Sequence, residues 1–283
     1  MSDTVTDLRT LNQPRARSFV LPREHGAWGI LLVPLVTGAT VALLRGGALV
    51  PVLLFLLASM SLFCLRTPVE AALGTSAQRI DTPAERRLVA VAIAGYSAVA
   101  AATLAALLWN GNNPSLLMLG AIAMFSFGAQ TLLRKFGRST RMASQMAGLI
   151  GLTSTAAAAY YISTGRLDTT AWMVWAANWL FAANQVHMVQ LRIHNAKVAG
   201  LKERLVRGWK FLAGEILTVV LLTVFFRYRL LPKMSVVAFH PILLRGAAWF
   251  FKKPRPLHVR PLGWMELGFA LVFGVMFVSG FLR

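Results

Sequence analysis

The chain has 283 residues, of which 57% are hydrophobic and only 14% are charged, whereas an ordinary soluble domain has roughly 25% charged residues. Its formal net charge is +19, from 29 basic and 10 acidic residues. Such a charge can indicate nucleic-acid binding, but here the basic residues lie between long apolar runs instead of on one face or tail. The composition therefore argues against most soluble classes and against a nucleic-acid partner, and it indicates a protein of the lipid bilayer.

The apolar runs predict an all-α, polytopic membrane helical bundle, because a spanning helix needs about 20 mostly apolar residues. Residues 1–23 are polar and carry no signal-cleavage pattern, so we expect a cytoplasmic N-terminal tail followed by a single transmembrane domain over 24–283. About nine transmembrane helices are expected, at 26–44, 46–65, 88–108, 116–133, 146–164, 171–191, 211–226, 234–251 and 266–282.

The distribution of Lys and Arg predicts the orientation of these helices. Basic residues are frequent in the tail and in alternate gaps, namely 66–87, 134–145, 192–210 and 252–265. The other gaps are poorer in Lys and Arg, except for 227–233, which contains Arg227, Arg229 and Lys233. Since basic loops stay in the cytoplasm, we expect a multi-pass protein with its N-terminus cytoplasmic and its C-terminus outside.

Ionisable and amide side chains gather at the predicted cytoplasmic ends of the helices. A charge costs at least ~2.5 kcal/mol at the centre of a membrane helix, so these residues are candidates for a ligand site. Glu215 lies within an apolar run, one turn from its predicted inner end, and should be protonated or paired with Arg or Lys of another helix. The alternative is that the candidates merely occupy the headgroup region. The candidate residues for the ligand site are Glu24, His25, Arg66, Glu70, Asn184, His187, Gln190, Arg192, His194 and Glu215.

The predicted helix 171–191 and the residues after it are the most informative segment. Asn184, His187, Gln190 and His194 recur at spacings of three and four, so they share one helical face. A polar face on an apolar helix predicts a stripe directed into the bundle, where it lines a ligand or only bonds neighbouring helices. His187 and His194 are too far apart for a compact metal clamp, and no metal site is predicted.

Two stretches resemble the YwiC-like family of bacterial membrane proteins. They are Pro22-Arg-Glu-His-Gly-Ala-Trp-Gly-Ile-Leu-Leu-Val-Pro-Leu-Val-Thr-Gly38 and Asn184-Gln-Val-His-Met-Val-Gln-Leu-Arg-Ile-His-Asn-Ala-Lys197. The resemblance implies a protein of the bacterial inner (cytoplasmic) membrane, but no particular reaction, because the family has no assigned activity.

The chain also distantly resembles the UbiA prenyltransferases, in the proline and glycine of its first helix, Pro34 and Gly38, and in its basic loops. That resemblance implies a nine-helix scaffold with catalytic loops after helices 2 and 6 on the cytoplasmic side. UbiA enzymes hold Mg²⁺ and an isoprenoid diphosphate with Asp-rich motifs in these loops. Here the second helix is followed by Arg66-Thr-Pro-Val-Glu70, and no acid lies between Asp168 and Glu203. We therefore expect no cofactor, with Mg²⁺ only if UbiA-like chemistry is retained.

Three functions remain open on the sequence. The first is binding of a lipid, isoprenoid or quinone-type ligand, or of haem, in a cavity open to the cytoplasmic side. The second is a metal-independent or divergent membrane transferase, with Glu70 and Glu215 as acid or base, the histidines as base or orienter, and Arg66 and Arg192 on an anionic headgroup. Transport is the least favoured, because no internal repeat is evident and the polar residues are expected at one end of the helices.

Overall fold

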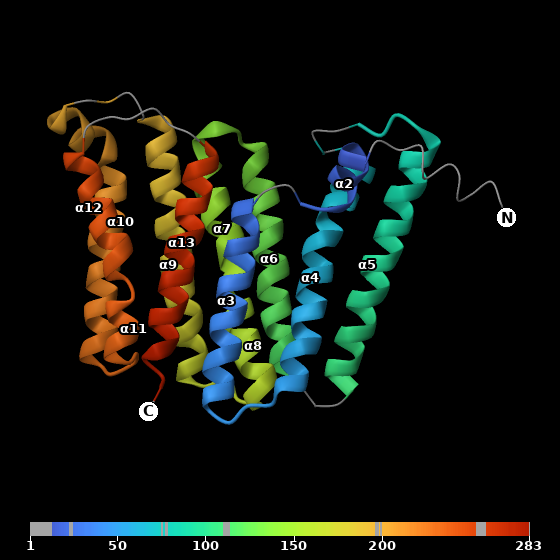
Figure 1. Cartoon of the computed structure of the whole chain (residues 1–283), viewed down its shortest axis with the longest axis horizontal. Helices are drawn as coiled ribbons and strands as arrows, with labels where there is room; N and C mark the ends of the chain where they lie inside the picture. The colour runs from blue at the N-terminus through green and yellow to red at the C-terminus, as the bar shows by residue number, and fades with distance from the viewer. Residues whose placement is uncertain are drawn as a thin grey trace. The chain divides into compact units, whose positions relative to one another are not determined.

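The computed structural model describes residues 13–22, 25–74, 76, 79–109, 114–195, 198, 200–252 and 259–282. Throughout these residues the regular elements are helices (Figure 1). The chain divides into two compact units, one formed by residues 1–25 and 49–113 and the other by residues 26–48 and 114–283. Each unit is described by itself.

The first unit contains α2 (Gln13–Val20), α4 (Leu49–Ala72) and α5 (Pro83–Trp109), and α4 and α5 pack along each other (Figure 1). Helix α5 begins with a capping box. Glu85 accepts the backbone N–H of Thr82 at 3.1 Å, and the Thr82 hydroxyl accepts the backbone N–H of Glu85 at 3.2 Å. Thr82 and Glu85 thereby satisfy each other's free backbone donors, and Pro83 follows at the first helical position.

Only a tail was expected before residue 24, but residues 13–20 form the helix α2, which packs on α4 and α5. Its Phe19 is buried against Ala71 and Val89. Its Arg15 forms ion pairs with Asp81 and with Glu85, the latter at 2.6 Å. The segment is short and polar, so it carries no membrane-helix signal, and its apolar contact depends on a single aromatic side chain.

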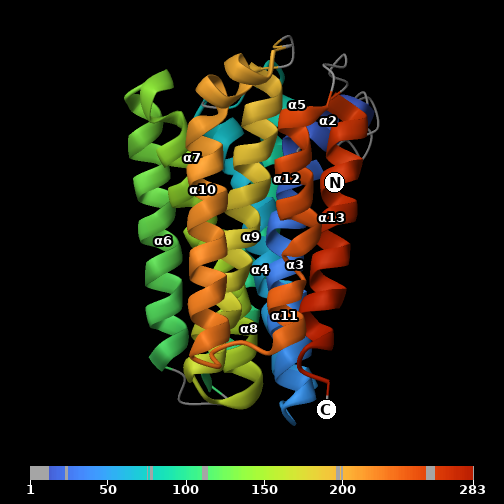
Figure 2. The ribbon, with the colours of Figure 1, turned by 90° about the vertical axis from the view of Figure 1, so that its left-hand side faces the viewer.

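The second unit is a larger bundle in which α9, α10, α12 and α13 lie side by side (Figures 1 and 2). Gly38 of α3 lies against the backbone of Ala156 in α8 so closely that a Cβ atom would overlap the Ala156 carbonyl oxygen. Asn178 of α9 accepts a hydrogen bond from Thr37 of α3 at 3.2 Å. The helices are α3 (His25–Leu44), α6 (Pro114–Lys135), η1 (Arg138–Thr140), α7 (Arg141–Thr153), α8 (Thr155–Thr164), α9 (Thr169–His194), α10 (Leu201–Arg227), α11 (Lys233–Val237), α12 (His240–Phe251) and α13 (Val259–Ser279).

Two of the expected helices are interrupted. The range 146–164 is divided at Ser154, where the hydroxyls of Thr153, Ser154 and Thr155 each donate to a carbonyl of the preceding turn at 2.7 Å. Hydroxyls bonded in this way compete with the helical hydrogen bonds and bend a helix. The range 234–251 is divided between α11 and α12, where Pro241 starts the second piece.

Within the described residues, six helical segments are long and apolar enough to cross a membrane, with α11 and α12 together counted as one of them. Many of their large apolar side chains are exposed, including Phe125 at 78% and Val275 at 72%. Apolar surface of this extent is unusual on a soluble protein and indicates a lipid environment. The six are Leu49–Ala72, Pro83–Trp109, Pro114–Lys135, Leu201–Arg227, Lys233–Phe251 and Pro261–Ser279.

The chain is thus all-helical and of multi-pass membrane type. Each expected range is helical over most of its described length, but the number of nine spans and their orientation remain predictions. Several helices begin earlier than expected, and the difference is largest for α10, which begins at Leu201 instead of 211, and for α13, which begins at Val259 instead of 266. The first turns of α10 are rich in charged residues, which a search for apolar runs excludes although such residues are good helix formers.

Candidate functional site: a buried polar cluster

Four polar side chains from four helices of the second unit meet inside the bundle. Asn184 of α9 and Glu215 of α10 are 7% and 8% exposed. The side chains of Arg245 in α12 and Glu266 in α13 are 8% and 12% exposed. We call these four residues the polar cluster. Their helices are neighbours in the bundle, as Figure 2 shows for α9, α10 and α12.

Hydrogen bonds connect the polar cluster in a continuous chain. The Asn184 side-chain N–H donates to Oε1 of Glu215, while its Oδ1 accepts from Nη2 of Arg245 at 3.4 Å. Arg245 Nη1 donates to Oε2 of Glu266 in a short ion pair. The neighbouring Gln185 donates to the backbone carbonyl of Glu266 at 2.7 Å, so α9 is also bonded directly to α13.

Apolar and aromatic groups surround the cluster. The Arg245 guanidinium lies over the ring of Phe269, 4.6 Å from the ring centroid, in a cation–π contact. Gly246 leaves room for Glu215, because a Cβ there would stand 2.7 Å from Oε1 of that carboxyl group. Next to it, Phe211 packs with Met188 and other buried side chains of α9 and α12. Water is therefore displaced around the charges, and each hydrogen bond there is stronger than in solvent.

The polar cluster leaves hydrogen-bonding capacity unused. Nε of Arg245 and Oε1 of Glu266 are buried and have no partner among the described residues. The cluster also contains two carboxyl groups and one guanidinium, so full ionisation would leave it with excess negative charge. Buried polar groups are nearly always bonded, so these two atoms, on residues that are ion-paired with each other, can each bond to a ligand that offers an acceptor and a donor.

The predicted polar face of helix α9 is only partly directed inward. Asn184 bonds to α10, and His187 also faces α10, with its ring edge-on to Phe211 at 5.3 Å between centroids. Further along, Arg192 contacts the sulfur of Met265 at 3.8 Å. His194 is exposed, and its Nδ1 lies 2.8 Å from the carbonyl oxygen of Gln190. The residues of this face differ in burial because helix α9 runs from the interior of the bundle to the end of the bundle.

The remaining candidates belong to the first unit or to undescribed positions. Arg66 and Glu70 lie one turn apart on α4 and form an ion pair at 2.8 Å. Glu24 and the side chain of His25 lie outside the described residues. In the part of the chain that the structure describes, no group of three or more His, Cys, Asp or Glu residues could hold a metal ion.

Three positions in the polar cluster differ from the sequence-based expectation. Glu215 lies near the middle of α10 and not one turn from its end, because α10 begins at Leu201. Arg245 and Glu266 were not among the candidates, although an arginine within an apolar run was a signal that could have identified the first. Glu215 was expected to be protonated or paired with Arg or Lys of another helix, but its direct partner is the Asn184 amide, and Arg245 is bonded to that amide instead of to the Glu215 carboxyl group.

A comparison with known protein families finds a match to the family described as YwiC-like protein over residues 21–160. No curated protein matches the chain. The first of the two YwiC-like stretches lies within the match, whereas 184–197 and the polar cluster lie beyond it. Over residues 21–160, just under half of its length, this membrane-type chain is therefore similar to YwiC-like proteins.

Proposed function

We propose that this chain is a YwiC-like protein of the bacterial inner membrane that binds an isoprenoid or quinone-type lipid, with the polar end of the ligand at the polar cluster. In this proposal the scaffold is UbiA-like, the N-terminus is cytoplasmic, and the ligand enters from the cytoplasmic side. The observation that carries the proposal is the unused donor and acceptor of Arg245 and Glu266 within an otherwise apolar bundle.

The chemistry of a quinone suits these two atoms. A quinone carbonyl accepts a hydrogen bond, as Nε of Arg245 requires, and a quinol hydroxyl can donate one to Oε1 of Glu266. Leaving a buried polar group without a partner costs about 1–3 kcal/mol, so a ligand that satisfies both gains that energy. The apolar helices around the cluster suit an isoprenoid tail. None of these contacts requires a metal ion.

Quinone titration of the full chain in lipid nanodiscs tests the proposal. We expect saturable quenching of tryptophan fluorescence by a short-chain ubiquinone or menaquinone. Arg245→Lys keeps the positive charge but removes Nε, and it should weaken binding about tenfold, the value of one hydrogen bond to a charged group. The matched control is Arg207→Lys, because Arg207 is an exposed arginine of α10 paired with Glu203 at 2.8 Å. Absence of saturable binding, or equal affinity in Arg245→Lys and the wild type, would contradict the proposal.

A second candidate, proton-coupled transport, is favoured by the interrupted helices. Transporters place their sites near the middle of the membrane, beside discontinuous helices. Arg245 lies on α12, which is separated from α11, and Glu215 lies near the middle of α10. In proteoliposomes with an imposed pH gradient, a proton-coupled transporter would dissipate the gradient when substrate is added, and Glu215→Gln would abolish this dissipation. A gradient unaffected by every lipid-soluble and polar metabolite tested would exclude this candidate.

A further inference from the structure

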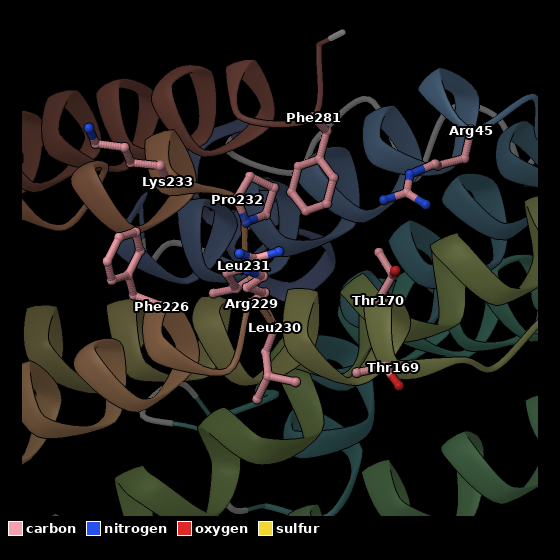
Figure 3. Close-up of a pocket in the computed structure, with 10 residues that line it drawn as sticks. All are labelled: Arg45, Thr169, Thr170, Phe226, Arg229, Leu230, Leu231, Pro232, Lys233 and Phe281. Carbon is pink, nitrogen blue, oxygen red and sulfur yellow. The ribbon is translucent and has the colours of Figure 1, made fainter.

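A pocket of about 440 Å³ lies in the second unit and shares no residue with the polar cluster. Its wall is formed by the residue after α3, the first residues of α9, the end of α10 with the turn that leads to α11, and Phe281 just after α13 (Figure 3). By the distribution of basic loops, these helix ends are the ones expected outside the cytoplasm. The pocket is therefore separate from the site proposed above.

Three cations line this pocket, namely Arg45, Arg229 and Lys233, and no acidic residue lines it. None of the three forms an ion pair with another described residue. Figure 3 shows the Arg45 guanidinium on the same side of the pocket as the Thr170 hydroxyl, whereas the Lys233 side chain lies at the opposite edge and extends away from them. Cations that share a pocket without a counter-charge repel one another, and a bound anion relieves that repulsion.

The nearest acid along the chain is Asp168, and its carboxylate is already engaged. It caps α9 by accepting the backbone N–H of Ala171 at 3.1 Å, and it accepts the Tyr160 hydroxyl at 3.2 Å. Its hydrogen-bonding capacity is thus directed to the start of α9 and not to the three cations.

The backbone at Arg229 gives a second, independent observation. Helix α10 ends in a Schellman motif, with Leu230 N–H bonded to the Phe225 carbonyl at 2.8 Å and Arg229 N–H to the Phe226 carbonyl at 3.1 Å. The residue at this place takes a left-handed conformation and is usually glycine. Arg229 adopts this left-handed conformation, with φ of 55°. Among the described residues it is the one that has a positive φ without being glycine. A side chain retained in a conformation that disfavours it indicates that the side chain itself has a role.

We propose that this pocket binds a phosphate group, either the headgroup phosphate of an anionic phospholipid or a soluble phosphate. The guanidinium groups of Arg45 and Arg229 offer the paired donors that phosphate oxygens accept, and the Thr170 hydroxyl adds another donor. Phe226 and Leu230 add apolar surface beside these donors. The site also accounts for the basic segment 227–233, which interrupts the alternation of basic and non-basic loops.

Native mass spectrometry of the full chain in detergent tests the lipid source, with phosphatidylglycerol as the probe and phosphatidylcholine as the neutral comparison. Equilibrium dialysis against radiolabelled inorganic phosphate tests the soluble source. The variants are Arg229→Gly and Arg45→Gln, and the matched control is Arg227→Gln, an exposed arginine of the same turn that does not line the pocket.

Each variant should lower binding of the true ligand by about tenfold or more, while the control binds as the wild type does. Arg229→Gly should also leave the melting temperature unchanged or raise it, because glycine adopts the left-handed conformation without strain. Binding of phosphatidylglycerol alone identifies the lipid source, and binding of inorganic phosphate alone identifies the soluble source. The proposal is overturned if neither probe binds, or if Arg229→Gly and Arg45→Gln bind as tightly as Arg227→Gln.

Discussion

The ion pair between Arg245 and Glu266 gives the sharpest prediction about stability. Both side chains are about nine-tenths buried, so neither charge can be solvated once its partner is removed. Replacing Arg245 by Met leaves the Glu266 carboxyl group without its ion-pair partner and removes the cation that is bonded to Asn184 beside Glu215. Breaking a buried pair in this way costs about 3–5 kcal/mol. Glu266→Met should cost a similar amount, because it leaves the guanidinium with only Asn184.

The double variant Arg245→Met/Glu266→Met should recover most of that loss, since replacing both charges by apolar groups of similar volume is close to neutral. The coupling free energy from the double-mutant cycle should therefore be about 3 kcal/mol or more. The assay is reversible unfolding in mixed dodecyl maltoside and sodium dodecyl sulfate micelles, followed by tryptophan fluorescence. A coupling free energy below about 1 kcal/mol, the range of a solvent-exposed pair, would refute the inference that the cluster is desolvated.

Three further predictions follow from the packing and the helix ends. Gly38→Ala should destabilise the protein by about 1–3 kcal/mol, because the new Cβ atom would overlap the Ala156 backbone. Gly120→Ala is the matched control, and it should stabilise the protein by about 0.5–1 kcal/mol because no atom lies near its Cβ. Equal effects of the two substitutions in the unfolding assay would contradict the close approach of α3 and α8. Glu85→Gln should loosen α2, measured as faster hydrogen exchange over residues 13–20, and unchanged exchange would mean that the ion pair does not hold α2. Asp168→Ala should cost about 1 kcal/mol by removing the cap of α9, and a smaller loss would show that water replaces the cap.

The helical ranges could be predicted from the sequence because a bilayer requires long apolar segments, and that requirement is local along the chain. What is not local could not be predicted in the same way. The division at Ser154 depends on three consecutive hydroxyls that turn to the backbone, and the same residues are compatible with an unbroken helix. The start of α10 was placed too late because its first turns are charged.

The polar cluster shows the same limit. Asn184 and Glu215 were candidates because each interrupts an apolar run, but the sequence did not indicate that they touch each other. Arg245 was visible in an apolar run, and its partners on α9 and α13 depend on which helices are neighbours. A single sequence does not show directly which helices are neighbours. Polar residues can therefore be selected one by one from the sequence, but which of them lie together must come from the structure.

The central claim is that the polar cluster receives the polar end of a lipid-type ligand, and direct identification of the bound molecule tests it. Protein purified from native membranes is extracted, and the extract is compared by mass spectrometry with that of Glu215→Gln and of the exposed-site control Glu203→Gln. We expect an isoprenoid or quinone in near-stoichiometric amount in the wild type and in Glu203→Gln, and its depletion in Glu215→Gln. An absence of such a lipid from the wild type, or equal amounts in all three proteins, would contradict it.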